Sequence, residues 1–201
     1  MTEESVAPDG RPMVHPVNRD EWRAWLAANH ATSKGVWLVT FRRATGKPRV
    51  DYAESVEEAL CFGWVDSRAG KLDAERSLLW FTRRNPKSGW ARPNKERVAR
   101  LEAAGLMEPA GLAMVEEAKR RGTWSMLDDV EDRIVPDDLA AALDAIPPAR
   151  ANWDAFSSSS RRGILEWIVQ AKRPETRAKR VDETARLAAM NQKANQWTPK
   201  A

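Results

Sequence analysis

The segment from Trp80 to Asn94 brings indole rings, guanidinium groups and turn-forming residues close together in the chain. From residue 76 to residue 100 there are eight basic residues and one acidic residue, a local charge of +7 against +4 for the whole chain. Concentrated positive charge beside flat rings suits a partner that carries phosphate or carboxylate groups. We therefore expect an anionic ligand, either nucleic acid or a small phosphorylated or carboxylated compound. The candidate ligand-binding residues are Trp80, Arg83, Arg84, Lys87, Trp90, Arg92 and Asn94.

Two interpretations of this segment are open at the level of the sequence. In the first, the basic side chains contact anionic oxygens while Trp90 offers a stacking face, which contributes about 1–3 kcal/mol per base in single-stranded nucleic acid. In the second, the arginines pair within the chain with the ten carboxylates between residues 108 and 144, which outnumber the basic residues there. Internal pairing would leave little positive field for a partner.

A second group of polar residues, Asp66-Ser67-Arg68, follows a predicted strand, and such positions often host sites. An enzyme acting on a small phosphorylated or carboxylated substrate could use Asp66 as general base and Arg83 or Arg84 as anion clamp. The structural alternative is a turn closed by a local Asp–Arg pair. No nucleophile or oxyanion donor is identifiable beside Asp66, so a non-enzymatic binding protein is the leading hypothesis.

Several common chemistries lack their residues in this chain. One cysteine, Cys61, and two distant histidines do not form a zinc ligand set, and no HExxH or CxxC spacing occurs. P-loop, GxGxxG and GxSxG motifs are also missing, so we expect neither a metal nor a cofactor. Cys61 stands near the C-terminal end of a predicted helix, where the dipole disfavours a thiolate. A buried structural thiol is the expectation.

The composition, 42% hydrophobic and 31% charged residues, is that of a globular protein. At 201 residues, one domain, or one domain with a helical appendage, is expected. The acidic N-terminal stretch does not resemble a secretory signal, and no segment approaches the roughly 20 apolar residues that cross a bilayer. These features predict a cytoplasmic protein without a membrane span.

Capping patterns and hydrophobic periodicity predict the elements that position these groups. Asn18 with Glu21, and Asp51 with Glu54, form capping boxes that open two helices, the second of which ends at Gly63. Asn94 is expected to cap a further helix. Apolar, β-branched and aromatic runs predict strands at residues 35–41, 64–66 and 78–81.

These elements predict an α+β fold with a small, mainly antiparallel sheet and flanking helices, followed by a helical C-terminal region. A basic cluster in that region is expected to be mainly a solvated helix face, and its helices could dock a protein partner. The cluster consists of Arg177, Lys179 and Arg180. The expected organisation is a flexible tail at 1–17, an α+β part at 18–126, an acidic linker at 127–136, a helical part at 137–192 and a tail at 193–201.

Five separate motifs, in order along the chain, resemble the YdeI/OmpD-associated, bacteriocin-protection-like family. The resemblance spans roughly residues 18 to 190 and implies a bacterial stress or envelope-protection role. It implies no established reaction or cofactor. The motifs are residues 59–67, 81–94, 105–111, 162–168 and 171–180.

Overall fold

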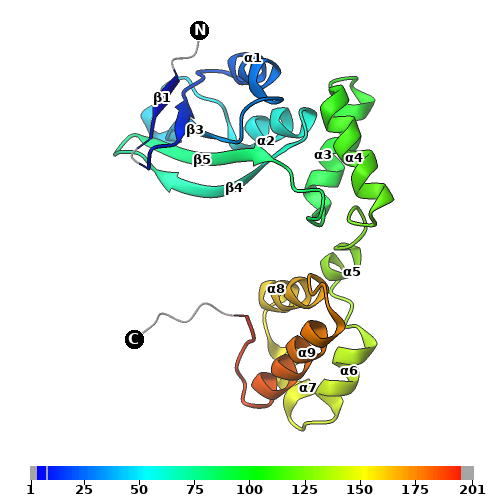
Figure 1. Cartoon of the computed structure of the whole chain (residues 1–201). Helices are drawn as coiled ribbons and strands as arrows, with labels where there is room; N and C mark the ends of the chain where they lie inside the picture. The colour runs from blue at the N-terminus through cyan, green and yellow to red at the C-terminus, as the bar shows by residue number, and fades with distance from the viewer. Residues whose placement is uncertain (1–3, 8, 196–201) are drawn as a thin grey trace. The chain divides into compact units, whose positions relative to one another are not determined.

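The structure, a computed structural model, describes residues 4–7 and 9–195, which form two compact units. The first unit comprises residues 1–124 and the second residues 125–201 (Figure 1). Each unit has its own hydrophobic core. The first is an α+β unit and the second is helical, so the predicted fold class is confirmed.

The first unit is built on a five-stranded sheet with the strand order β1-β2-β3-β5-β4. Only the β2–β3 pair is parallel, and the other three pairs are antiparallel, as the sequence predicts for most of the sheet. A register shift between Asp66 and Arg68 interrupts the β4–β5 ladder. The strands are β1 (Glu4–Val6), β2 (Pro12–Val14), β3 (Val36–Phe41), β4 (Trp64–Lys71) and β5 (Arg76–Arg83).

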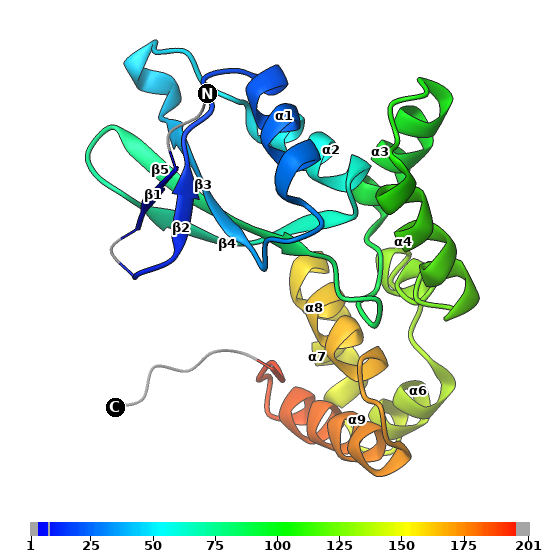
Figure 2. The same cartoon turned by 45° about the horizontal axis from the view of Figure 1, so that its top comes forward.

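Helices cover one face of this sheet, and α1 and α2 lie side by side on it (Figures 1 and 2). The Asn18 side chain caps α1 by accepting a hydrogen bond from the Glu21 backbone N–H at 2.9 Å. The predicted capping box of Asp51 and Glu54 opens α2. The helical segments of this unit are α1 (Arg19–Asn29), the short 3-10 helix η1 (Arg43–Thr45), α2 (Tyr52–Cys61), α3 (Arg92–Ala103) and α4 (Pro109–Arg120).

The core of the first unit lies between this sheet face and the helices. Trp22 and Trp25 stack at 5.5 Å between ring centroids, and Trp22 also contacts Phe81 of β5. The last turn of α2 supplies Leu60 and Cys61, which are fully buried. Several of the ten tryptophans therefore build the core, since large rings bury much apolar area at a modest entropic cost.

The second unit is a cluster of helices around a separate apolar core. The helix α9 packs against α6, α7 and α8. Trp153, Ile164 and Ile168 are among its fully buried side chains. Its helices are α5 (Asp128–Glu131), α6 (Asp137–Asp144), α7 (Ala149–Ala155), α8 (Ser158–Val169) and α9 (Pro174–Ala189).

The structure differs from the sequence prediction at five places. Asp66, Ser67 and Arg68 lie within β4, which continues to Lys71, rather than after the strand. Strands β1 and β2 occupy part of the predicted flexible tail, because the sheet edge offers them partners. Asn94 lies inside α3, where Ala91 is the N-cap and Pro93 fits the first turn. The predicted acidic linker contains α5. In the predicted tail at 193–201, Ala194 is buried, whereas residues 196–201 lie outside the described residues.

Candidate anion-binding site

Arg84 follows β5 directly and places its side chain inside the first unit. Its backbone N–H donates to the Gly63 carbonyl at 3.0 Å, which fixes the residue beside the C-terminal end of α2. The residue is only 6% exposed, and its guanidinium carbon lies 3.9 Å from the centroid of the Trp90 ring. One guanidinium nitrogen donates to the Gly89 carbonyl, while the buried Nε has no hydrogen-bond partner.

Electrostatically, Arg84 is a cation without a contacting anion. Burial lowers its pKa to about 10, and the carboxylate of Asp66 opposes this shift. The side chain therefore stays protonated at neutral pH. Among the residues that the structure describes, Arg84 forms no ion pair. A buried charge without a partner is costly, and groups of this kind concentrate at functional sites.

The loop between Arg84 and α3 is held in place by its own turns and by the segment after α4. The Asn85 side chain accepts from the Lys87 backbone N–H at 2.9 Å. The Trp90 backbone N–H donates to the Thr123 carbonyl at 3.2 Å, and the Thr123 hydroxyl donates to the Pro86 carbonyl at the same distance. The loop is therefore anchored at both ends, and Arg84 is held against Trp90.

The charge of Asp66 raises the pKa of Arg84, so this carboxylate belongs to the electrostatic surroundings of the guanidinium. The Tyr52 hydroxyl, at the start of α2, donates to an Asp66 carboxylate oxygen at 3.1 Å. Burial and then the Asp66 charge raise the pKa of Tyr52, while Arg97 of α3 opposes them. The site thus joins the end of β5, the edge strand β4 and the N-terminal parts of α2 and α3. We call Arg84, Trp90, Asp66 and Tyr52 the Arg84 cluster.

The structure separates the other residues that the sequence grouped together. Arg83 donates to the carbonyls of His30 and Ala31, in the turn after α1. Trp80 lies on the opposite sheet face, against Trp37. Lys87 is exposed in the loop. In the first turn of α3, Arg92 is exposed and Asn94 is half-buried.

Neither open interpretation describes the contacts of Arg83 and Arg84. Arg83 and Arg84 donate to backbone carbonyls rather than to the carboxylates of residues 108–144. Trp90 is 2% exposed, with Arg84 on one side and Trp124 at 5.0 Å between ring centroids. It therefore lines the site from inside the fold and has no face exposed for a nucleic-acid base.

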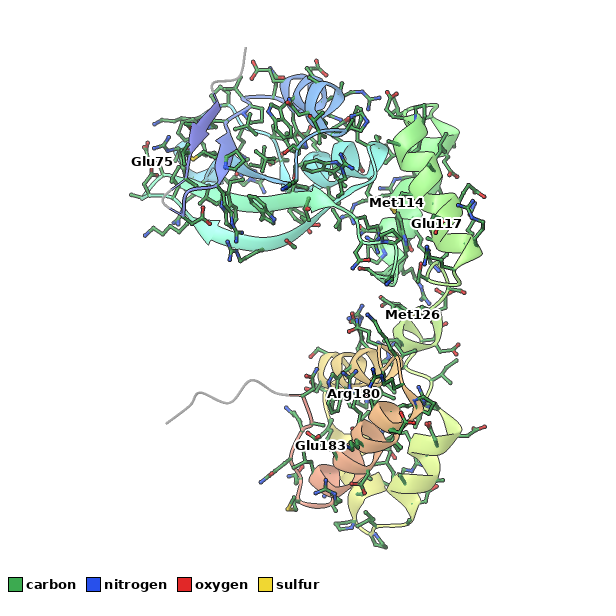
Figure 3. All side chains as sticks on the ribbon, in the orientation of Figure 1. Glu75, Met114, Glu117, Met126, Arg180 and Glu183 are labelled. Atoms are coloured by element: carbon green, nitrogen blue, oxygen red, sulfur yellow. The ribbon has the colours of Figure 1, made fainter. Side chains whose placement is uncertain are left out.

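The predicted burial of Cys61 is confirmed, and burial raises the pKa of its thiol. In the basic cluster of α9, Arg177 forms a bidentate pair with Asp138, with distances of 2.7 and 2.9 Å. Arg180, labelled in Figure 3, lies over the Trp167 ring at 4.9 Å. These two arginines are thus engaged within the second unit.

The described part of the chain contains neither a metal-ligand group nor a helix that could span a membrane. No group of three or more His, Cys, Asp and Glu side chains in residues 4–7 and 9–195 is placed to hold a metal ion. Within the same residues, no helix has both the length and the apolar composition to traverse a bilayer.

The fold and the site define a two-unit protein, in which an α+β unit with a buried, unpaired arginine precedes a helical unit. A family model described as a domain of unknown function (DUF8412) matches residues 14–114, just over half of the chain, and the chain belongs to that family. A second model, described as "Bacteriocin-protection, YdeI or OmpD-Associated" (OmdA), matches residues 132–191. No curated protein and no solved structure matched the chain.

Each family match falls within one of the two compact units. The resemblance to the YdeI/OmpD-associated family is confirmed for the helical unit, which contains the motifs at 162–168 and 171–180. The three motifs between residues 59 and 111 lie in the stretch matched by the domain of unknown function.

Sequence reasoning missed Tyr52 as the partner of Asp66, and Arg97 as a charge that acts on Tyr52. The partnership depends on how the helices pack against β4, and no local spacing signals it. The β-bulge at Ser67 also escaped notice, since nothing in Asp66-Ser67-Arg68 distinguishes a bulge from a turn.

Proposed function

We propose that the first unit binds a small anionic ligand through Arg84, and that the protein acts in bacterial stress or envelope protection without catalysing a reaction. The observation that carries the binding proposal is the buried Arg84 guanidinium, which has an unused Nε donor and no contacting carboxylate. A ligand carboxylate or phosphate would supply both the missing charge and the missing acceptor. The match of the helical unit to the bacteriocin-protection family supports the physiological role.

The burial of Trp90 favours a small compound over nucleic acid. Single-stranded nucleic acid binds through exposed rings on which successive bases stack, and Trp90 does not offer such a face. A cytoplasmic location also belongs to the proposal.

Calorimetric titration with inorganic phosphate and with citrate tests the binding proposal. Arg84→Met should weaken binding at least about tenfold, because it removes the cation and the unused donor. Lys87→Gln is the matched control, since it removes an exposed positive charge from the same loop and should change affinity less than about twofold. Circular dichroism establishes that both variants fold. Equal binding by wild type and Arg84→Met, or binding to neither anion, would refute the proposal.

The alternative function, an enzyme with Asp66 as general base, is favoured by one observation. The Tyr52 hydroxyl contacts Asp66, whose charge acts on Arg84, so the site supplies an acceptor, a hydroxyl and a cation. Under this alternative, Asp66→Asn would abolish turnover of a phosphate or carboxylate ester while leaving anion affinity intact. Under the binding proposal, neither the wild type nor Asp66→Asn turns over such an ester.

A further inference from the structure

The sheet face opposite α1 and α2 carries a second aromatic cluster. Trp37 of β3 and Trp80 of β5 are directly paired in the ladder, and their rings meet edge to face at 5.3 Å between centroids. The Trp80 ring lies over Gly35, where a Cβ would come within 2.4 Å of a ring carbon. The two indoles are therefore fixed on the sheet by close packing.

Each of these rings has a guanidinium above it. The guanidinium carbon of Arg68 lies 4.9 Å from the Trp37 centroid, and that of Arg11 lies 4.9 Å from the Trp80 centroid. Both arginine side chains are about half exposed, in contrast to Arg84. The ring faces orient the two cations by cation–π attraction without neutralising their charge.

A single carboxylate, Asp9, lies among these groups. Its oxygens accept hydrogen bonds from the Trp37 indole N–H at 3.1 and 3.3 Å and from the Arg11 backbone N–H at 3.2 Å. One of the same oxygens lies 3.3 Å from a guanidinium nitrogen of Arg68 and 3.8 Å from Nε of Arg11. An indole N–H, a backbone N–H and two guanidiniums make a complete donor set for an oxyanion.

Two features make Asp9 a replaceable occupant of this donor set. The two arginines outweigh its one negative charge, so the cluster keeps a net charge of +1 with the site filled. Asp9 also belongs to the connection between β1 and β2 and is partly exposed, so it can move away without disturbing the core. A phosphate group, which carries about −1.5 to −2 charge at neutral pH, would match the two cations better than a carboxylate does.

We propose that Arg11, Arg68 and the Trp37 indole form a second anion site, in which Asp9 is the resting occupant and a phosphate-bearing ligand displaces it. This site is separate from the Arg84 cluster. A tethered carboxylate competes at an effective concentration on the order of millimolar, so Asp9 lowers the apparent affinity of the free site. Removing the carboxylate should therefore expose the intrinsic affinity.

The experiment follows the Trp37 indole N–H by nuclear magnetic resonance, with the signal assigned from a Trp37→Phe variant. Inorganic phosphate and AMP are titrated into the wild type, Asp9→Asn and Asp9→Ala. Asp9→Asn keeps an acceptor for the Trp37 indole N–H. It should therefore preserve the local fold, and it serves as the test variant in case Asp9→Ala disturbs that fold. Either probe should shift the signal saturably, with at least about tenfold tighter binding in the Asp9 variants. Tighter binding of AMP than of phosphate would identify a nucleotide ligand, and equal binding would identify a free phosphate group.

The added change Arg68→Gln, in the Asp9→Asn background, should abolish the response. The titration is repeated with Arg84→Met, and the Trp37 signal should still respond, so failure at one anion site is distinguishable from failure at the other. A Trp37 response no tighter in Asp9→Asn than in the wild type would overturn the inference. So would an unchanged response after Arg68→Gln.

Discussion

The guanidinium carbon of Arg84 lies 3.9 Å from the centroid of the Trp90 ring, and both residues are buried. The sequence places these two residues in one basic, aromatic segment, and they do meet in the fold. They meet inside the first unit, however, where the indole ring covers one side of the guanidinium. A cation–π contact of this desolvated kind contributes about 2 kcal/mol, which offsets only part of the cost of burying an unpaired charge.

Replacing Arg84 by Met should therefore leave the fold at least as stable. The flexible Met side chain can fill the space beside Trp90, and the burial cost of the charge disappears. We expect the free energy of unfolding of the first unit, measured in urea, to stay within about 1 kcal/mol or to rise. Arg23→Met is the contrasting variant, because it removes a partner of the buried Glu58 and should be clearly destabilising. A large loss of stability in Arg84→Met would indicate a structural role for this arginine.

Two glycines should respond in opposite ways to the same substitution. A Cβ on Gly111 of α4 would come within 2.2 Å of the Cys61 carbonyl oxygen, whereas a Cβ on Gly163 of α8 meets no atom within 4 Å. Gly111→Ala must push α4 away from α2 and should cost about 2–3 kcal/mol. Gly163→Ala should stabilise the second unit by roughly 0.5–1 kcal/mol, because alanine is the better helix former.

Urea unfolding followed by circular dichroism measures both glycine variants. Because the chain has two compact units, each substitution should move the transition of its own unit. A Gly111→Ala protein as stable as the wild type would contradict the close packing of α4 on α2.

The sequence contains enough local information to predict much of the fold. Asn18 and Asp51 cap their helices as expected, because a cap depends on residues three apart in the chain. Strands β1 and β2 could not be predicted in the same way. Each is three residues long, and β1 pairs with β2, which in turn pairs with β3. Pairing between distant segments cannot be predicted from the strand propensity of the residues alone.

The candidate site was predictable only in part. Charge counting located Arg84 and Trp90, but burial decides which arginine lacks a partner, and burial depends on tertiary packing. Trp80 illustrates the limit: strand alternation places it on the opposite face from Phe81, next to residues from distant parts of the chain. Asp9 and Arg68 are 59 positions apart, so their contact has no local signature.

Glu58 should be among the most sensitive carboxylates of the first unit. It is buried in α2, where it accepts hydrogen bonds from Arg19 at 2.5 Å and from Arg23 at 2.7 Å. Glu58→Gln removes the charge that both arginines share and should cost about 3–5 kcal/mol of unfolding free energy. Glu75→Gln is the matched control (Glu75 is labelled in Figure 3). Glu75 and its partner Lys47 are both about half exposed, so the substitution should cost less than about 1 kcal/mol of unfolding free energy. Equal effects of the two substitutions in urea unfolding would contradict this prediction.

Cys61 should remain unreactive in the folded protein and should make stability depend on alkaline pH. Burial, followed by the nearby Glu58 carboxylate, raises the pKa of the thiol above its ordinary value of 9.0, and Arg23 opposes the shift. Because the folded state holds this proton more tightly than the unfolded state, the stabilisation is present below the ordinary pKa and is lost as the pH rises above it. Iodoacetamide should therefore label the thiol slowly at neutral pH, and faster in urea.

The alkaline loss can be assigned to the thiol by comparing urea unfolding of the wild type and Cys61→Ala. The difference between the two proteins should be constant up to about pH 8 and should shift in favour of Cys61→Ala at higher pH, since only the wild type has the thiol proton to lose. Parallel pH profiles would mean that the thiol ionises as easily in the folded chain as in the unfolded one. Rapid labelling at neutral pH would point to the same conclusion, because it requires a thiolate that solvent can reach.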